Sequence, residues 1–163
     1  YCFLSYILTN TYQASFNMKI INNKEDAIQE LLSHLQSLDI LSSTIKLFKN
    51  IKEQEHIFTS SAGRGVAYPH TTSIEINKLT CVLGISKDGI DFDSPDGHYC
   101  HLILLTLSPS NDPKEHRKFI TRFRSMVDNP AIRSNLQEAY TCENILNIIS
   151  QWEEDDNRKD DLV

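Results

Sequence analysis

The sequence of 163 residues has no long hydrophobic run and contains little glycine or proline. Its opening stretch YCFLSYIL is apolar but too short to cross a bilayer, which takes about 20 apolar residues. The stretch also lacks a basic leader and a small-residue cleavage site, so we expect no export and no membrane insertion. With 5 glycines and 5 prolines, the chain is not a low-complexity protein. These absences predict a globular protein of the cytoplasm.

Cysteine is scarce and its spacing is uninformative. The four cysteines are Cys2, Cys81, Cys100 and Cys142, and none of them forms a CxxC pair. A chain of this length buries roughly two thirds of its unfolded surface in one core, so it folds without disulfides. We therefore expect one domain with reduced thiols.

Positive charge is in deficit, because 16 Lys and Arg residues face 22 Asp and Glu residues, for a net charge of −6. Proteins that bind nucleic acid need a clustered Lys/Arg face, so we exclude nucleic acid as a partner. The tail holds six acidic and two basic residues, which is −4 of the total. We predict a domain over residues 1–152 and an acidic, disordered tail over residues 153–163.

Several segments have hydrophobic residues at helical spacing. The first begins at Asn23, in a sequence that resembles a capping box, and runs to Leu38. The strongest start is Asp112, a capping residue followed by Pro at the first helical position and Glu at the third. Asn129-Pro130 ends that helix. Further helical segments are predicted over residues 43–54, 132–136 and 142–153.

Strands are predicted between these helices. The clear ones cover residues 79–86 and 99–107, and the second contains the unbroken apolar run Leu102–Leu105. Such a run indicates burial on both faces of a sheet, with helices above and below it. Turns are predicted at residues 87–89 and 95–97. The alternation of strands and helices predicts an α/β domain.

The stretch GRGVAYPHTT, residues 63–72, places His70 just past a short predicted strand that stops at Pro69. A neutral imidazole is a good nucleophile near pH 7 and can attack phosphorus. Backbone amides, hydroxyls and a cation in the surrounding loop can bind phosphate oxygens. The candidate pocket residues are Ser60, Arg64, Gly65, Thr71 and Thr72. The local sequence leaves open that His70 is an ordinary surface histidine beside a turn.

A second chemical cluster, His98-Tyr99-Cys100-His101, contains favoured zinc ligands. On a strand, however, His98 and Cys100 face one side and His101 the other, and no second ligand pair is spaced to complete a tetrahedron. A serine or cysteine nucleophile is also disfavoured, because the sequence has no GxSxG elbow. We therefore predict no metal site.

The segment TSSAGRGVAYPH, Thr59–His70, resembles the active-site signature of the fructose/mannitol-type IIA domains of the bacterial phosphoenolpyruvate-dependent phosphotransferase system, including their nitrogen-regulatory branch. In that family a Ser/Thr pair, a Gly-rich turn and an Ala-x-Pro-His ending present the phospho-accepting histidine, here His70. His116, at a helix start, matches the family's second active-site histidine. The resemblance covers residues 3–152 and includes the opening segment Leu4–Thr9.

This resemblance implies a single-domain sandwich in which a mixed sheet is flanked by helices. It implies phosphoryl transfer from an HPr-like carrier to His70, with His116 positioning or stabilising the phosphate and with no metal or ATP. A transport member would pass the phosphate to a IIB domain, whereas a regulatory member would bind target proteins according to its phosphorylation state. The freestanding sequence and its opening segment favour the regulatory branch.

Two residues depart from the family pattern. The family usually has an Arg-Glu pair before the Ser/Thr turn, and this chain has Gln54-Glu55, whose amide offers no charge-assisted bidentate bond to phosphate. Three outcomes stay open: Lys52 or Arg64 compensates, transfer is slow, or the protein is a binding-only regulator. Tyr68 replaces a small aliphatic residue and places a bulky ring next to the site.

Overall fold

The computed structural model describes residues 15–17 and 23–160, so the predicted opening segment Leu4–Thr9 lies outside the described residues. The described chain forms one five-stranded sheet. Its strands are β1 (Ser15–Asn17), β2 (Val66–Ala67), β3 (His70–Ser73), β4 (Thr80–Ile90) and β5 (Cys100–Pro109). β5 pairs antiparallel with β4 and parallel with both β2 and β3, and β1 pairs parallel with β4. The sheet is therefore mixed.

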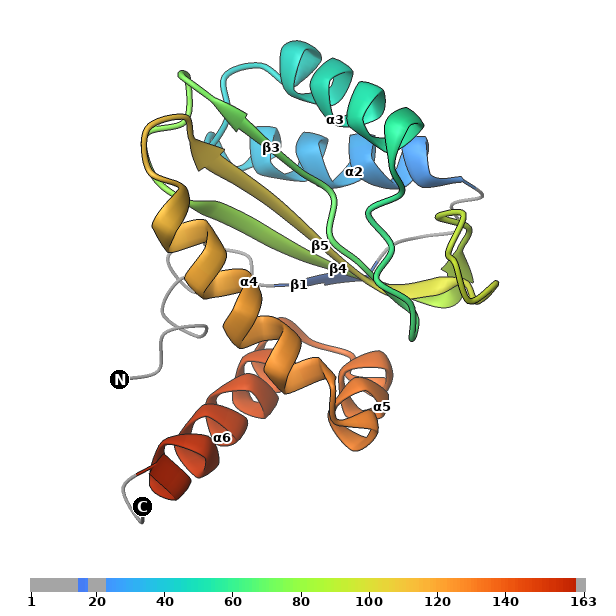
Figure 1. The fold of residues 1–163 in the computed structure, drawn as a ribbon, viewed down its shortest axis with the longest axis vertical. Helices are drawn as coiled ribbons and strands as arrows, with labels where there is room; N and C mark the ends of the chain where they lie inside the picture. Colours follow the sequence, from blue (N-terminus) through green and yellow to red (C-terminus); the bar gives the residue numbers. More distant parts are fainter. Residues whose placement is uncertain (1–14, 18–22, 161–163) are drawn as a thin grey trace.

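Helices cover both faces of this sheet (Figure 1). One face carries α2 (Lys24–Ser37) and α3 (Ile45–Ile57), and the other carries α4 (Pro113–Val127), α5 (Pro130–Glu138) and α6 (Cys142–Asp160). Two hydrophobic cores result. β5 contributes to both, because its side chains alternate: Leu102 and Leu104 enter one core, and Ile103 and Leu105 the other. The predicted fold class, a mixed sheet flanked by helices, is confirmed.

The predicted helix starts are confirmed by their caps. The Asn23 side chain accepts a hydrogen bond from the Asp26 amide at 2.8 Å, and Asp112 accepts one from the Lys114 amide at 3.1 Å. The carboxamide of Asn129 caps α5 in the same way. α5 therefore begins at Pro130, soon after α4 ends at Val127, and it is longer than the predicted 132–136 segment. Each cap satisfies an amide that has no partner inside its helix.

The turn predicted at residues 87–89 is wrong, because β4 continues through it to Ile90. The register with β5 shifts between Ile85 and Ile90, which marks a bulge. Gly89 lies there at φ +80°, and its amide donates to Ser86 Oγ at 3.1 Å. The local residues suit a hairpin turn and a bulge equally, so only the pairing with β5 distinguishes the two.

The C-terminal helix is longer than the sequence predicts. Disorder is predicted from Glu153 onward, whereas α6 continues to Asp160. The Glu153 side chain is fully buried, and Asp156 pairs with Arg122 of α4. The Arg122 guanidinium also lies 4.7 Å from the centre of the Trp152 ring. These contacts with another helix explain why an acidic segment is ordered.

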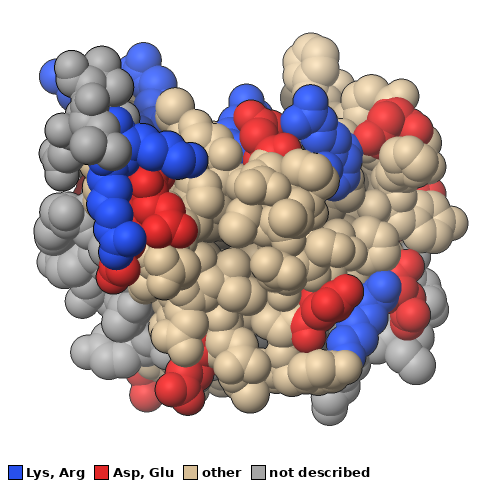
Figure 2. Space-filling model, turned by 90° about the horizontal axis from the view of Figure 1, so that it is seen from below, with Lys and Arg blue, Asp and Glu red and all other residues tan. Residues whose placement is uncertain are grey.

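Charged side chains of both signs are mixed on the face seen in Figure 2, where they surround a largely uncharged centre. That face shows no extended field of Lys and Arg, as the net charge of −6 leads one to expect. Within residues 15–17 and 23–160, no helix combines the length and the apolar character of a membrane span.

The bulge provides a test of the fold. A Cβ atom added to Gly89 would lie 2.7 Å from Tyr99 Cβ, whereas one added to Gly97, also at positive φ (+74°), would meet nothing within 4 Å. Overpacking typically costs about 1–3 kcal/mol. We expect Gly89→Ala to lower the free energy of unfolding by about that much more than Gly97→Ala does, measured by urea denaturation. Equal losses would show that the bulge tolerates the added methyl group.

Candidate functional site

His70 is the first residue of a strand, not the tip of a loop. It pairs with Thr106 of β5, and the carbonyl of Pro69 accepts a hydrogen bond from the Thr106 amide at 3.0 Å. Because side chains alternate along a strand, His70 is exposed while Thr71 is 2% exposed. Thr71 and Thr72, both predicted to lie in a phosphate pocket, are not among the residues that line the two hollows described below beside His70.

One ring nitrogen of His70 is held by the backbone. Nδ1 lies 3.2 Å from the carbonyl oxygen of Tyr68, two residues earlier. A carbonyl oxygen can only accept a hydrogen bond, so Nδ1 carries the proton. The lone pair of the neutral ring then lies on Nε2. Nε2 is therefore the nucleophilic atom of this side chain.

His116 lies beside His70. The two ring centres are 5.6 Å apart, and the planes are inclined by 33°. His116 Nε2 lies 2.9 Å from Oγ1 of the fully buried Thr106, which fixes the ring at the start of α4. Burial lowers the pKa of His116, and the neighbouring His70 lowers it further. His116 is thus a neutral ring near pH 7.

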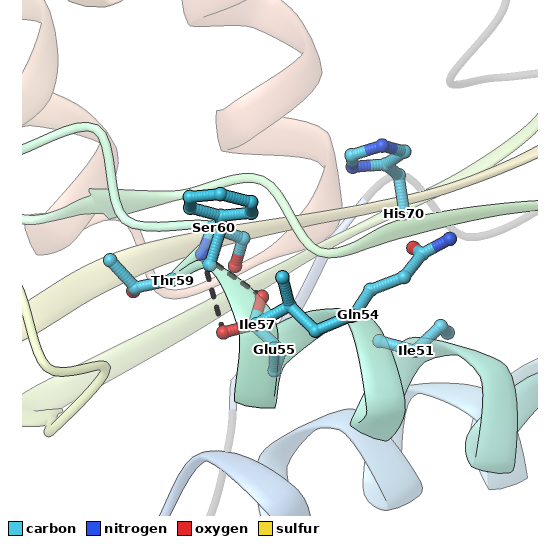
Figure 3. Close-up of a pocket in the computed structure, with 8 residues that line it drawn as sticks. Ile51, Gln54, Glu55, Ile57, Thr59, Ser60 and His70 are labelled. Carbon is cyan, nitrogen blue, oxygen red and sulfur yellow. Dashed lines mark hydrogen bonds between the residues drawn. The ribbon is translucent and has the colours of Figure 1, made fainter.

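The turn that faces these histidines is anchored by a buried carboxylate. Both oxygens of Glu55 accept hydrogen bonds from the Ser60 amide, at 3.0 and 3.2 Å (Figure 3). The Ser61 amide donates to Thr59 Oγ1 at 3.1 Å. Ser60 Oγ is buried and has no hydrogen-bond partner within the described part of the chain. Its hydroxyl is available to a ligand bound next to His70.

Two hollows meet at the His70 ring and share Thr59, Ser60 and His70. The first, of about 280 Å³, lies on the α3 side, where Figure 3 shows Gln54 extending from the helix and His70 standing on β3. The second, of about 270 Å³, lies on the α4 side. The α4-side hollow is lined by Thr59, Ser60, Ser61, Ala62, Tyr68, His70, His116, Ile120 and Arg124.

Of the predicted phosphate-pocket residues, Ser60 and Gln54 line these hollows, but Arg64 and Gly65 do not. Arg64 Nη1 pairs with Asp128 at 2.9 Å, and the Arg64 amide donates to Asp96 at 2.7 Å. The carbonyl of Gly65 accepts hydrogen bonds from two amides of β5, at His101 and the next residue. The glycine turn therefore attaches to the sheet and to the 94–98 loop instead of surrounding the imidazole.

Arg124 is a site residue that the sequence analysis missed. It follows His116 by eight residues and Ile120 by four, a spacing that puts all three on one face of α4. That spacing is the signal that marks it. The guanidinium carbon lies 5.0 Å from the centre of the Tyr68 ring. Burial raises the pKa of Tyr68 to about 12, against the opposing effect of Arg124, so this phenol stays neutral.

The cluster of possible zinc ligands is dispersed. His98 is exposed, Cys100 Sγ lies 3.3 Å from Ser61 Oγ, and His101 Nδ1 lies 2.9 Å from the Ser86 carbonyl oxygen. Burial raises the pKa of Cys100 to about 11, so its thiol is protonated near neutral pH. Among residues 23–159, no three His, Cys, Asp or Glu side chains are grouped as metal ligands.

Fold and site together define an α/β domain that presents an exposed histidine, His70, next to a second, partly buried histidine, His116. The chain belongs to the family described as the phosphoenolpyruvate-dependent sugar phosphotransferase system, EIIA 2, whose family model matches residues 10–152. It is therefore a IIA-type phosphotransfer protein, and the resemblance found in the sequence is confirmed.

Its relatives include sugar-specific and regulatory proteins. It is 27% identical over 128 residues to the fructose-specific EIIABC component of Bacillus subtilis, matching 78% of this chain but only 20% of that longer protein. It is 25% identical over 130 residues to a nitrogen regulatory protein of Bradyrhizobium diazoefficiens, matching 80% of this chain and 84% of the relative.

Solved structures show the same fold. The nitrogen regulatory protein IIA-Ntr of Neisseria meningitidis superposes with a TM-score of 0.78 at 23% identity, over 90% of this chain and 98% of that one. The IIA mannitol protein of Escherichia coli superposes with a TM-score of 0.71 at 18% identity, over 83% of this chain and 95% of that one.

The environment of His116 predicts its titration. We expect an NMR titration to give His116 a pKa below 6.5, because burial disfavours the imidazolium ion. His70→Ala removes the smaller cause, so the His116 pKa rises but stays below 6.5. In the unchanged protein, the folded state binds fewer protons than the unfolded chain at a pH between the lowered pKa of His116 and 6.5. The contribution of neutral His116 to the free energy of unfolding is therefore complete above pH 6.5 and is lost as the pH falls through the lowered pKa. A His116 pKa of 6.5 or higher in the unchanged protein would contradict the buried position of the ring.

Proposed function

We propose that this protein is a cytoplasmic phosphocarrier that accepts a phosphoryl group from an HPr-like protein on His70 and acts mainly as a regulatory, nitrogen-type IIA protein. The observation that carries this proposal is the state of the His70 ring. It is exposed on β3, and its Nδ1 proton is held by the Tyr68 carbonyl. The nucleophilic Nε2 is therefore open to a partner that carries a phosphohistidine.

The transfer step conserves charge and protons. The N–P bond of the donor breaks, and its electron pair remains on the donor ring, which leaves as neutral imidazole with the proton of its other nitrogen. The lone pair of His70 Nε2 forms the new N–P bond. The His70 ring keeps its Nδ1 proton and gains positive charge, which the Tyr68 carbonyl stabilises at 3.2 Å. No oxidant, reductant or nucleotide takes part.

His116 and Ser60 act on the phosphoryl group in this proposal. The neutral His116 ring is close enough to His70 to contact a phosphoryl group bound there, and Thr106 fixes its orientation. The Ser60 hydroxyl, which has no hydrogen-bond partner among the residues that the structure describes, offers a second donor from the turn that faces His70. Preorganised donors of this kind stabilise charge that develops during transfer. We assign both residues to phosphate positioning and reserve nucleophilic attack for His70.

The regulatory role is supported by the nitrogen regulatory relatives, which match over most of their own length. The fructose-specific relatives favour a second candidate, a sugar-transport IIA subunit that passes phosphate to a IIB domain. These roles differ in the acceptor. Loss of label to a IIB domain in the presence of sugar supports transport, whereas a target protein that binds only one phosphorylation state supports regulation.

Incubation with phosphoenolpyruvate, enzyme I and HPr tests the acceptor. We expect one acid-labile phosphate on Nε2 of a histidine, identified by NMR of the phosphorylated ring, because Nδ1 is occupied by Tyr68. His70→Ala abolishes this label, since it removes the nucleophile. The matched control is His56→Ala, which removes an exposed histidine of α3 and leaves labelling unchanged.

Two results would contradict the proposal. Label that persists in His70→Ala would place the acceptor elsewhere. A folded, unchanged protein that takes no label from any HPr tried, yet still binds a regulatory target, would favour the alternative of a binding-only regulator.

A further inference from the structure

We propose that Arg124, seated on the ring of Tyr68, supplies the cation that binds the phosphoryl group at His70, in place of a cation at position 54. The inference rests on the proposed function and adds to it a phosphate-binding residue and a positioning residue. It begins with a charge requirement. A phosphoryl group on His70 carries up to two negative charges, and the neighbouring His116 is neutral near pH 7.

Arg124 is the one residue with a permanent charge among the nine described residues that line the α4-side hollow. The other polar groups there are hydroxyls and the two imidazoles. The α3-side hollow is lined by the uncharged Gln54 and by Glu55, whose carboxylate is bound to the Ser60 amide. A dianion between the two hollows is therefore attracted toward the α4 side.

The other candidate cations are occupied elsewhere. Lys52 pairs with Glu25 at 3.0 Å, and Arg64 pairs with Asp128 at 2.9 Å. Arg124, in contrast, forms no ion pair with an acidic side chain of residues 23–159. Its guanidinium group keeps donors that can bind two phosphate oxygens at once.

Tyr68 provides the platform that orients this guanidinium. The Tyr68 ring is 6% exposed and meets Phe123 edge to face, with 6.1 Å between ring centres. Arg124 lies over it at 5.0 Å, within the range of a cation–π contact. The ring is fixed by the core, so it limits the conformations of the arginine and lowers the entropy lost when phosphate binds. The bulky residue next to the site thus has a positioning role.

Binding of inorganic phosphate tests this inference without any transfer step. We expect phosphate to shift the ring resonances of His70 and His116, and Arg124→Gln to raise the phosphate dissociation constant by roughly tenfold or more, as a lost charged hydrogen bond would. Arg124→Lys keeps the positive charge but loses the planar guanidinium group that binds two oxygens at once, so its phosphate dissociation constant lies between those of the unchanged protein and Arg124→Gln. The control Arg158→Gln removes the same charge from an exposed site on α6 and leaves phosphate affinity unchanged. Equal affinity in Arg124→Gln and the control would overturn the assignment.

The positioning role of Tyr68 is tested by two substitutions. Tyr68→Phe keeps the aromatic face but removes the hydroxyl that hydrogen-bonds with Arg124, so phosphate binding weakens less than in Tyr68→Leu, which removes both the face and the hydroxyl and weakens binding severalfold. Affinity is compared for folded protein, verified by its circular dichroism and unfolding transition. A Tyr68→Leu protein that is folded and binds phosphate like the unchanged protein would remove Tyr68 from the proposal.

A double-mutant cycle tests whether Arg124 takes the place of a cation at position 54 during phosphoryl transfer. Phosphoramidate serves as a small N–P donor and HPr as the protein donor. Gln54→Arg accelerates labelling of His70 much more in an Arg124→Gln background than in the unchanged protein, because only the former lacks a cation. An equal acceleration by Gln54→Arg in both backgrounds would show that Arg124 does not take the place of a cation at position 54. An effect of Arg124→Gln with HPr but not with phosphoramidate would also overturn that role, since Arg124 would then act on docking.

The outcomes separate this inference from the proposed function. Label on His70 at the unchanged rate in Arg124→Gln refutes the inference and leaves the function standing. Phosphate binding that depends on Arg124, in a protein that takes no label, supports the anion site and refutes the carrier function.

Discussion

Thr106 is the residue through which the sheet holds both histidines of the site. Its amide donates to the carbonyl of Pro69, its backbone is in register with His70, and its hydroxyl contacts His116 Nε2. Because Thr106 lies fully buried in β5, these three contacts share one rigid origin. The distance between the two rings is therefore a property of the sheet and of the first turn of α4, not of a surface loop.

Pro69 shapes the site by interrupting a strand without changing its register. Val66 pairs with Leu102 and His70 with Thr106, so the partners are 36 positions apart on both sides of the interruption. Proline has no amide to donate, but its carbonyl still bonds to β5. The break also leaves the Tyr68 carbonyl within 3.2 Å of the His70 ring. Pro69 thus keeps His70 in register with β5 and leaves the Tyr68 carbonyl next to Nδ1, the contact that selects the tautomer of the His70 ring.

Local sequence signals predict the parts of the fold that depend on neighbouring residues. The caps at Asn23 and Asp112 are of this kind, and so is the apolar run of β5, whose burial on both faces follows from its composition. The bulge at Gly89 and the extension of α6 depend instead on partners distant in sequence. No local pattern contains that information.

The site shows the same division. The motif around His70 and the helix start before His116 are readable in the sequence, but the strand that begins at His70 is not, because a short polar segment after proline also suits a loop. Arg64 has the right charge and belongs to the motif, yet it pairs with Asp128 and lines a neighbouring hollow with Tyr68 and Arg124 instead of the two hollows that meet at His70. Arg124 lies far along the chain, and only the packing of α4 on Tyr68 brings it to the site.

The two sides of the His70 ring differ in chemistry as a result. On the α3 side the hollow contains Ile51 and the exposed side chains of Ile57 and Phe58, which are 70% and 81% accessible. On the α4 side it contains the second imidazole and a guanidinium group, whereas Thr59 and Ser60 line both hollows. Both hollows offer hydrogen-bond donors to phosphate oxygens, because Gln54 lines the α3 side, but only the lining residues of the α4 side include a positively charged side chain. Under the proposal that Nε2 of His70 carries a phosphoryl group, the oxygens of that group are attracted toward α4, and this difference in charge between the two walls exists before any partner binds.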